Sequence, residues 1–359
     1  MMAPTIRYLI LWLTEACNLH CRYCYRPPVT APQTMSREVI DRALILAASS
    51  GRPFHVQLSG GEPTLVPELI AYTAQRLRKL GGRATLGLQT NGTRLTSALV
   101  TLVQRHHLQV GLSLDGPPAV HDALRGGFAE TLAGMQLLEK AQVPFRVTTV
   151  VSAANLATLD LLVLMLSGFR SCQGIGLDLL LTKGQALQHG VQPAVPEAWR
   201  QAIGALLRSL AFSNRRRQNP LRWREWDLVR QAARARRQQG FCHAARGESL
   251  AVQPDGTVYP CGQTCGEPQW DAGTVWQLRP DRLRLLADRC RPRQADCQSC
   301  PLTACCPGDC PSRLVYNDPQ EAELVCILYQ TIWQHDRRQA AWPSAVQIPD
   351  KKGDCCAAF

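Results

Sequence analysis

Three cysteines near the amino terminus have the residue type and the spacing of metal ligands. Cys17, Cys21 and Cys24 fall within one short loop. Three thiolates can hold three corners of an iron–sulfur cube and leave the fourth iron open to a ligand from outside the protein. A structural zinc site needs four protein ligands, and ferredoxin-type runs supply a fourth cysteine. The spacing therefore predicts a cluster with one open iron.

A glycine pair and a carboxylate follow the second predicted strand, at Gly60, Gly61 and Glu62. Glycines let a backbone approach a ligand closely, and the carboxylate can accept a hydrogen bond from an ammonium group. Such a segment alone is an ordinary turn. One strand after the cysteine loop, it predicts a second part of the same site.

Most of the remaining cysteines lie toward the carboxyl end. Sixteen cysteines occur in 359 residues, and twelve of them follow Phe241. A chain of this length needs no disulfides to fold, and we find neither a secretory signal nor an apolar run long enough to span a membrane. Cysteines in these numbers therefore favour metal or cluster ligation in the cytoplasm, with no membrane partner.

The elements that must position these residues follow a strand–helix alternation up to about residue 185. Repeated units of this kind predict an α/β fold with a parallel sheet covered by helices. Six units are too few for an eight-fold barrel, so we expect a partial (β/α)6 barrel with its chemistry at the carboxyl ends of the strands. The expected strands are 6–13, 54–58, 84–89, 109–114, 145–151 and 176–181. The expected helices include 36–49, 67–80 and 131–141, with Ser36 as the N-cap of the first.

Composition divides the chain into four parts. Residues 1–185 form the expected barrel, 186–240 a basic helical bridge, 241–335 a Cys-rich domain and 336–359 a flexible tail that carries Cys355 and Cys356. The Cys-rich part has few long apolar runs. We therefore expect bound metal to hold it together.

The net charge of +12 is concentrated in the expected bridge, where ten arginines from Arg208 to Arg237 stand against two acidic residues. This arginine run is either a solvated helical face or a docking surface for an acidic peptide or RNA. Trp223 and Trp226 lie within it and are candidate core anchors.

At these motifs the sequence resembles the radical S-adenosylmethionine (SAM) superfamily. The family's three-cysteine loop has an aromatic residue before the third cysteine, and Tyr23 occupies that place here. Its Gly-Gly-Glu-Pro motif reads Gly60 to Pro63. The resemblance implies a radical SAM-type barrel, a 4Fe-4S cluster on the three cysteines and SAM on the open iron, with Ser113 and Arg125 in contact with SAM. The residues that it places around SAM are Tyr23, Gly60, Gly61, Glu62, Asn91, Ser113, Asp115 and Arg125.

A second resemblance covers the carboxyl-terminal cysteines, whose spacing is similar to that of the SPASM domain. In relatives this domain holds two auxiliary 4Fe-4S clusters. The ligands that the resemblance implies for the first, cluster I, are Cys242, Cys261 and Cys310. Those implied for the second, cluster II, are Cys297, Cys300, Cys306 and Cys326.

These seven ligands leave one position of cluster I unfilled. We expect Cys265 to fill it, because only three residues separate it from Cys261 on the same loop. An open position that binds substrate is the alternative. Cys290 and Cys305 are expected not to bind a cluster, and Cys172 is expected to be a core residue.

Together the two resemblances imply an enzyme of peptide or protein maturation. An electron passed into bound SAM would yield a 5′-deoxyadenosyl radical, which abstracts a hydrogen from the substrate. We expect an oxidoreductase that crosslinks or oxidises a ribosomally made peptide and takes electrons from a flavodoxin- or ferredoxin-type donor. The auxiliary clusters could accept the substrate electron or bind the substrate. Because the first predicted strand starts by residue 6, a separate leader-binding protein or the arginine run would capture a leader peptide.

Three alternatives remain open. The sulfatase maturases that the chain resembles place an Asp, used as a general base, directly after the cysteine that matches Cys261, whereas Gly262 stands here. Formylglycine formation is therefore an alternative to the main expectation. Modification of RNA or of a small metabolite would suit the basic bridge. The third alternative is a non-catalytic protein that holds a cluster or zinc as a scaffold, but such a protein would not need the SAM-binding residues. We assign no catalytic acid or base.

Overall fold

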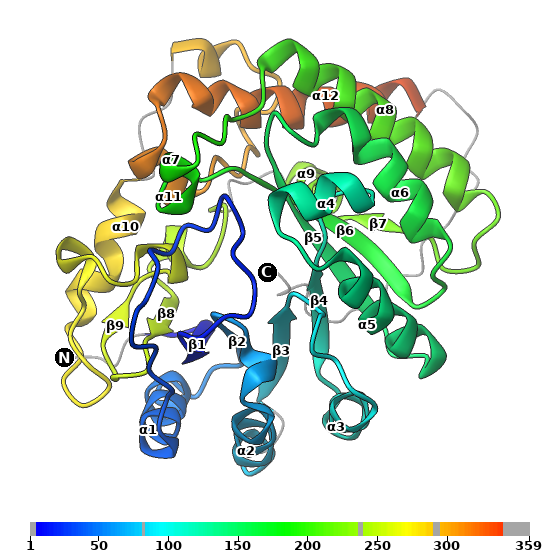
Figure 1. Cartoon of the computed structure of the whole chain (residues 1–359). Helices are drawn as coiled ribbons and strands as arrows, with labels where there is room; N and C mark the ends of the chain where they lie inside the picture. The colour runs from blue at the N-terminus through cyan, green and yellow to red at the C-terminus, as the bar shows by residue number, and fades with distance from the viewer. Residues whose placement is uncertain (1–4, 81–82, 236–239, 290–294, 340–359) are drawn as a thin grey trace.

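The computed structural model describes residues 5–80, 83–235, 240–289 and 295–339 (Figure 1). Within these residues, no helix is both long and apolar enough to cross a membrane. Cys290, Cys355 and Cys356, with most of the expected tail, lie outside the described residues.

A single sheet organises the chain, with strand order β7-β6-β5-β4-β3-β2-β1-β8-β9. The predicted partial barrel is confirmed, since β1 to β6 are all parallel and follow one another in chain order. These six strands are β1 (Tyr8–Thr14), β2 (Phe54–Gly60), β3 (Ala84–Thr90), β4 (Gln109–Ser113), β5 (Phe145–Val151) and β6 (Cys172–Leu179).

Strand β5 has its predicted bounds, β1 to β4 differ from theirs by one or two residues, and β6 differs by more. We expected β6 to begin at residue 176, but it begins at Cys172 and includes Gly174. A Cβ on Gly174 would lie 2.4 Å from the carbonyl oxygen of Arg222, and a Cβ on Gly176 would lie 2.9 Å from the guanidinium carbon of Arg224. The glycines make room for a neighbouring segment, which interrupts the apolar pattern without ending the strand.

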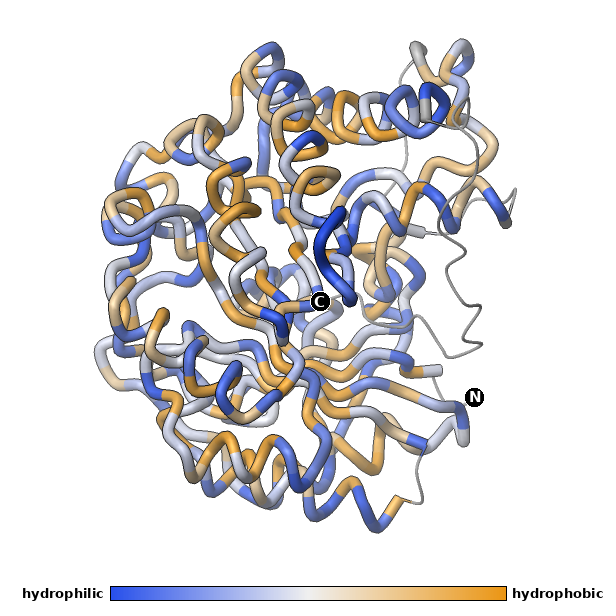
Figure 2. The backbone as a smooth tube through the Cα atoms, turned by 90° about the vertical axis from the view of Figure 1, so that its right-hand side faces the viewer, coloured by the Kyte–Doolittle hydropathy of each residue, from blue (hydrophilic) through white to orange (hydrophobic). Residues whose placement is uncertain are grey.

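The helices between the strands lie on the outside of the curved sheet (Figure 1). They are α1 (Arg37–Ala48), α2 (Pro67–Arg78), α3 (Ser97–His106), α4 (Pro118–Leu124), α5 (Phe128–Lys140) and α6 (Leu159–Ser167). Ser36 caps α1 as predicted, because its side chain accepts from the amide of Val39 at 3.2 Å. Hydrophilic and hydrophobic positions alternate along the outer helices (Figure 2). Leu9 and Leu11 of β1 are fully buried in the main core, while Trp12 belongs to a second core cluster.

The expected basic bridge is part of the barrel rather than a separate element. Its elements are α7 (Gln185–Gln188), α8 (Pro196–Asn214), β7 (Arg222–Trp223) and α9 (Arg224–Ala235). Strand β7 pairs in parallel with β6, and α8 packs against α6 and against α12 (Glu323–Gln339) (Figure 1). Trp223 is 1% exposed and Trp226 packs against the same core, so both are core anchors as predicted.

Several arginines of the run are used inside the fold. The Arg217 guanidinium donates to four carbonyl oxygens around the end of α6 and the start of β6. Arg224 forms ion pairs with Asp178 and Glu225, and Arg230 forms one with Asp336. These guanidinium groups stabilise the barrel. The arginine run is therefore neither a wholly solvated face nor an uninterrupted docking surface.

The Cys-rich part extends the sheet at its other edge and then continues in short elements. Strand β8 (Ser249–Val252) pairs in parallel with β1, and β9 (Val258–Tyr259) pairs antiparallel with β8. Its short α-helices are α10 (Leu285–Asp288) and α11 (Pro311–Tyr316). The 3-10 helices of the chain are η1 (Pro63–Leu65), η2 (Leu156–Thr158), η3 (Ala244–Arg246), η4 (Gly262–Thr264), η5 (Pro268–Trp270), η6 (Pro280–Arg284), η7 (Ala295–Gln298) and η8 (Pro319–Ala322).

The expected boundary of the tail at residue 336 falls inside α12, which continues to Gln339. Asp336 accepts hydrogen bonds from Trp226 at 2.8 Å and from Arg230 at 2.6 Å. These contacts tie the end of α12 to α9, so the expected start of the tail is wrong.

Candidate active site

The three amino-terminal cysteines lie in the loop after β1, at the carboxyl end of the strand where chemistry was expected. The thiols of Cys17, Cys21 and Cys24 are free and close enough to interact electrostatically. Burial raises the pKa of Cys21 to about 11, and the guanidinium of Arg125, whose Nη1 lies 3.9 Å from the Cys21 sulfur, opposes that rise. Three free thiols in one loop beside a cation fit a 4Fe-4S cluster with one open iron.

The glycine pair has a protein neighbour. A Cβ on Gly61 would lie 2.0 Å from the carbonyl oxygen of Ala16, and Gly60 has a positive φ of 134°. The amides of Gly61 and Glu62 donate to Thr14 O at 2.7 Å and to Ala16 O at 2.8 Å. We expected the glycines to let a ligand approach. They also let the end of β2 pack directly against the start of the cysteine loop.

Glu62 has several internal partners. It is 1% exposed, and its Oε1 accepts from the amide of Thr64 at 3.0 Å and from the hydroxyl of Thr90 at 2.6 Å. Its Oε2 accepts from the amide of Asn91 at 2.8 Å. Burial raises the pKa of Glu62, and these hydrogen bonds oppose the rise. Glu62 therefore fastens the end of β2 to the end of β3, a positioning role that the sequence interpretation lacked.

Asn91 reaches back to the cysteine loop. Its side-chain nitrogen donates to Asn18 Oδ1 at 3.1 Å, and Asn18 in turn donates to the hydroxyl of Thr93 at 2.8 Å. Asn18 stands directly after Cys17 and was missed by the sequence interpretation, because an asparagine in a loop carries no signal of its own. This chain of hydrogen bonds joins the cysteine loop to the end of β3.

Asp115, Tyr23 and Arg125 form one buried group behind the cysteine loop. The Asp115 carboxylate is fully buried and accepts from Arg125 Nε at 2.8 Å and from the Tyr23 hydroxyl. Its other oxygen accepts from the amide of Val150 at 3.0 Å. The Arg125 guanidinium also lies 5.2 Å over the Tyr23 ring. These partners make Asp115 a positioning residue for Tyr23 and Arg125, and its expected contact with SAM stays a prediction.

The backbone of Asp115 is held by two further buried side chains. Asn155 donates to Asp115 O at 3.0 Å and to Val150 O at 2.9 Å, and His121 Nδ1 accepts from the Asp115 amide at 3.3 Å. Sequence analysis missed Asn155, which stands in a turn after β5. Ser113, on the preceding strand end, is 9% exposed and accepts from Gln89 at 3.0 Å. Its contact with SAM stays a prediction, as does that of Arg125.

The cysteines expected to bind cluster I come together in the structure. The thiol of Cys310 interacts electrostatically with those of Cys242 and Cys261, and it lies 3.5 Å from Gln263 Oε1. Cys265 interacts with Cys261, and its thiol lies 3.6 Å from the Cys261 carbonyl oxygen. Cys265 therefore lies beside Cys261 as expected, and its role as the fourth ligand stays a prediction.

The cysteines expected to bind cluster II are also neighbours. Burial, together with interactions with Cys306, Cys297 and Cys300, raises the pKa of Cys326 to about 11. The amide of Gly308 donates to the Cys306 sulfur at 3.4 Å.

Cys305 was expected to bind no cluster, and Cys172 was expected to be a core residue. Cys305 interacts with Cys300 and so lies at the edge of the cluster II group. Cys172 is fully buried in the main core, as predicted.

The described residues offer no three His, Cys, Asp or Glu side chains that converge on a single metal ion. A 4Fe-4S cluster is larger than one ion and takes its thiolates at separate corners. The thiols of the three groups suit such a cluster in their chemistry.

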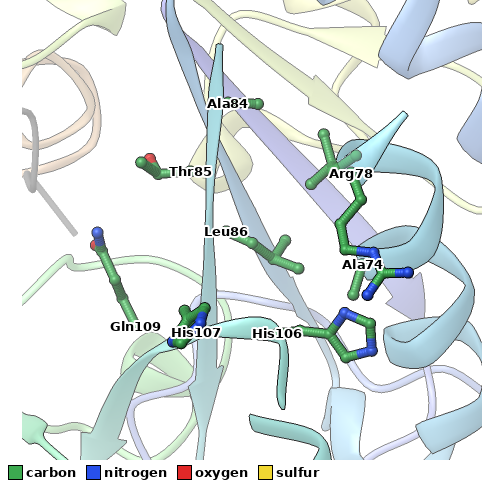
Figure 3. A pocket seen from close by; sticks show the side chains of 9 residues that line it. Ala74, Arg78, Ala84, Thr85, Leu86, His106, His107 and Gln109 are labelled. Atoms are coloured by element: carbon green, nitrogen blue, oxygen red, sulfur yellow. The ribbon is translucent and has the colours of Figure 1, made fainter. Parts of the chain in front are cut away.

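A hollow of about 340 Å³ lies at the opposite end of the strands (Figure 3). Ala84 and Gln109, which begin β3 and β4, line it together with His106 and His107. The candidate active site lies at the carboxyl ends of the same strands. The hollow is therefore not part of it.

Comparison with protein families matches residues 13–159 to the radical SAM superfamily. Among curated proteins, the chain is 29% identical over 338 residues to a serine-type anaerobic sulfatase-maturating enzyme of Klebsiella aerogenes, covering 83% of this chain and 78% of that protein. It is 38% identical over 159 residues to an AdoMet-dependent heme synthase of Methanosarcina barkeri, covering 41% of this chain and 44% of that protein.

Solved structures share the fold over most of the chain. Native anSMEcpe with bound AdoMet superposes with a TM-score of 0.74 at 20% identity, covering 94% of this chain and 98% of that one. Streptococcus suis SuiB bound to S-adenosylmethionine gives 0.63 at 15% identity, covering 87% and 74%. Residues 13–159 are therefore a radical SAM domain, and over most of its length the chain is similar to an anaerobic sulfatase maturase.

Proposed function

We propose that this enzyme modifies a ribosomally made peptide by crosslinking or oxidation. In this proposal Cys17, Cys21 and Cys24 hold a 4Fe-4S cluster whose open iron binds SAM. When bound, the cluster and SAM together supply a 5′-deoxyadenosyl radical that takes a hydrogen atom from the peptide.

The protein's own part is to bind, orient and exclude water. Arg125 uses Nε for Asp115 and places Nη1 3.9 Å from the Cys21 sulfur, which leaves Nη2 to donate to the carboxylate of SAM. The fully buried Asp115 carboxylate fixes the direction of that guanidinium and of the Tyr23 ring. The bonds of Glu62 to Thr90 and Asn91 hold two strand ends in one arrangement, so that little reorganisation is needed when SAM binds.

The observation that carries the proposal is the position of the cluster I cysteines beside the barrel site. A Cβ on Gly262 would lie 3.4 Å from Trp12 Nε1 of β1 and 3.8 Å from the hydroxyl of Tyr25, the residue after Cys24. A cluster bound at Cys261 would therefore lie next to the SAM site, where it can take an electron from a substrate radical or bind the substrate. Auxiliary clusters at both carboxyl-terminal groups are part of this proposal.

Similar proteins support a peptide substrate. One relative is a sulfatase-maturating enzyme. The structural neighbour SuiB has been solved bound to the precursor peptide SuiA. Formylglycine formation is the second candidate. It is less favoured because Gly262 supplies no carboxylate where sulfatase maturases place their Asp. A flavodoxin- or ferredoxin-type donor and a separate leader-binding protein complete the proposed partners, with the reaction in the cytoplasm.

The test is an anaerobic assay of the full chain with SAM, a chemical reductant and peptides of two kinds. Short precursor peptides encoded beside the gene form one set, and a sulfatase active-site peptide forms the other. We expect 5′-deoxyadenosine together with a precursor peptide that has lost hydrogen by mass spectrometry. Turnover of the sulfatase peptide alone would establish the alternative. SAM cleavage without change in either peptide would contradict a peptide substrate of these kinds.

A further inference from the structure

A short segment after β6 contacts the loops of both the SAM site and cluster I. The amide of Gln185 donates to Cys24 O at 2.8 Å. Gly184 has a φ of 61°, and a Cβ there would lie 2.6 Å from Tyr25 O, so the chain passes the cysteine loop at a point where only glycine fits. The ammonium of Lys183 donates to Gln263 O at 2.6 Å. Lys183 is thereby fixed between the two loops.

The Lys183 ammonium faces the cluster I cysteines. It is close enough to Cys261 and Cys265 to interact electrostatically with both thiols. Its side chain is only 15% exposed, so solvent and salt screen its charge less than they screen that of a surface lysine.

Glu267 and Tyr316 hold the ammonium in this place. Lys183 forms an ion pair with Glu267, whose second oxygen accepts from the Tyr316 hydroxyl at 2.8 Å. The Lys183 nitrogen also lies 4.4 Å over the centre of the Tyr316 ring. Glu267 both orients the ammonium and offsets part of its charge.

A cation in this position acts on electron transfer. An iron–sulfur cluster becomes more negative when it accepts an electron, so a nearby positive charge stabilises its reduced form. The reduction potentials of such clusters depend on local charge, hydrogen bonds and solvent exposure. A buried ammonium beside Cys261 would therefore raise the potential of a cluster bound there, and the carboxylate behind it would lower that potential.

We propose that Lys183 sets the reduction potential of cluster I, and that Glu267 moderates the effect. In the reaction this matters after the peptide has lost a hydrogen atom to the 5′-deoxyadenosyl radical. The peptide radical then passes one electron to cluster I and releases one proton to water, which leaves an oxidised peptide and a cluster reduced by one electron. Since the inference needs a cluster at Cys242, Cys261 and Cys310, it rests on the proposed function.

The test measures the midpoint potential of cluster I by electron paramagnetic resonance during a redox titration of the iron-loaded full chain. We expect Lys183→Met to lower the potential and Glu267→Gln to raise it. Lys183→Arg keeps the charge and serves as the control, with a potential close to that of the wild type. Cysteine variants of each group assign the signals to their clusters.

Opposite shifts distinguish a charge effect from general damage. If Lys183→Met and Glu267→Gln moved the potential in the same direction, or if neither moved it, the inference would be wrong while the proposed function stood. Iron analysis of the same samples distinguishes a failure of this inference from a failure of the proposed function. About 4 iron atoms per chain would mean one cluster only, and the proposal of auxiliary clusters would fail together with the inference.

Discussion

The barrel site and the carboxyl-terminal cysteine groups are positioned by different means. Around the cysteine loop, Glu62, Asn91 and Asp115 each bond to residues from another strand end, and all three are buried. The region from 295 to 310 contains the 3-10 helix η7, which includes Cys297, followed by turns and irregular segments that carry Cys300, Cys305, Cys306 and Cys310.

This difference has a physical consequence. The barrel fixes its site through hydrogen bonds among its own residues. Hydrogen bonds around Cys297 to Cys306 close turns within the segment itself, such as Cys300 N to Cys297 O at 3.3 Å and Cys306 N to Leu302 O at 2.6 Å, so we expect a bound cluster to contribute to its folding energy. The first site is thus prepared by the fold, while we expect the second group to depend on a bound cluster.

The largest expected effect separates the two regions by function. Replacing Cys17 with Ala should abolish SAM cleavage, because an incomplete cluster cannot present its open iron to SAM. Replacing Cys300 with Ala should leave SAM cleavage in place and abolish peptide product. Chromatography of 5′-deoxyadenosine and mass spectrometry of the peptide measure the two outcomes. Equal loss of both activities in the two variants would remove the distinction between the sites.

Iron content and protease resistance sharpen the same comparison. Three clusters predict about 12 iron atoms per wild-type chain and about 8 after all three amino-terminal cysteines are replaced by Ala. The Cys300→Ala variant should become sensitive to protease between residues 295 and 310, whereas the barrel of the Cys17→Ala variant should stay resistant. A barrel that unfolds without its cluster would contradict the view that its own hydrogen bonds prepare the site.

A smaller effect is expected from one carboxylate in the barrel. Asp115→Asn removes the negative charge from a fully buried group that holds Arg125. Leaving a buried cation without its partner costs about 3 kcal/mol of folding free energy, and SAM should bind more weakly because the guanidinium loses its fixed direction. Chemical denaturation and SAM titration of the anaerobic protein measure both.

The chain offers a matched control for this change. Asp41 also accepts from an arginine and a tyrosine, Arg76 at 2.7 Å and Tyr72 at 2.9 Å, but it is 28% exposed on the outside of the barrel. Asp41→Asn should cost less than about 1 kcal/mol and leave SAM binding unchanged. If the two substitutions were equally mild, the Asp115 group would not be positioning Arg125.

The strands and the cysteine groups could be predicted from the sequence because their signals are local. Short apolar runs mark β1 to β6, and a cysteine loop directly after β1 places its thiols at the strand end. The division of the cysteines from 242 to 326 into two groups was implied by the resemblance of their spacing to that of the SPASM domain.

The remaining features depend on contacts between distant residues. The positioning role of Asp115 depends on Tyr23 and Arg125, which lie 92 and 10 residues away in the chain, so the sequence pattern does not show it. Strand β7 is only two residues long, which is too short to show an alternation of apolar and polar residues. Its pairing with β6 could therefore not be predicted from the sequence. The arginine run looked like a surface because the carbonyls and carboxylates that accept its hydrogen bonds lie elsewhere in the chain.

The smallest expected effect concerns a histidine inside the barrel. His55 is 3% exposed, stacks on Tyr8 with ring centres 5.2 Å apart, and bonds to the Thr85 hydroxyl at 2.7 Å. Burial lowers the pKa of His55 to about 4, a hydrogen bond with Gln57 opposes that shift, and His243 adds to it. The folded protein therefore keeps His55 neutral at a pH where the unfolded chain already binds a proton.

The sign of the pH effect follows from this difference. Between the unfolded value near 6.5 and the folded value, the unfolded state binds more protons, so the free energy of unfolding falls as pH falls. From pH 7.5 to pH 5.5 the loss from this one group is about 1 kcal/mol. Denaturation of the anaerobic protein at the two pH values should show a smaller pH effect in His55→Gln, while substituting the exposed His189 should leave it unchanged. If His55→Gln left the pH dependence of the free energy of unfolding unchanged, His55 would not be its source. The carboxyl-terminal region, and not the barrel interior, would then be the part of the protein that loses stability at low pH.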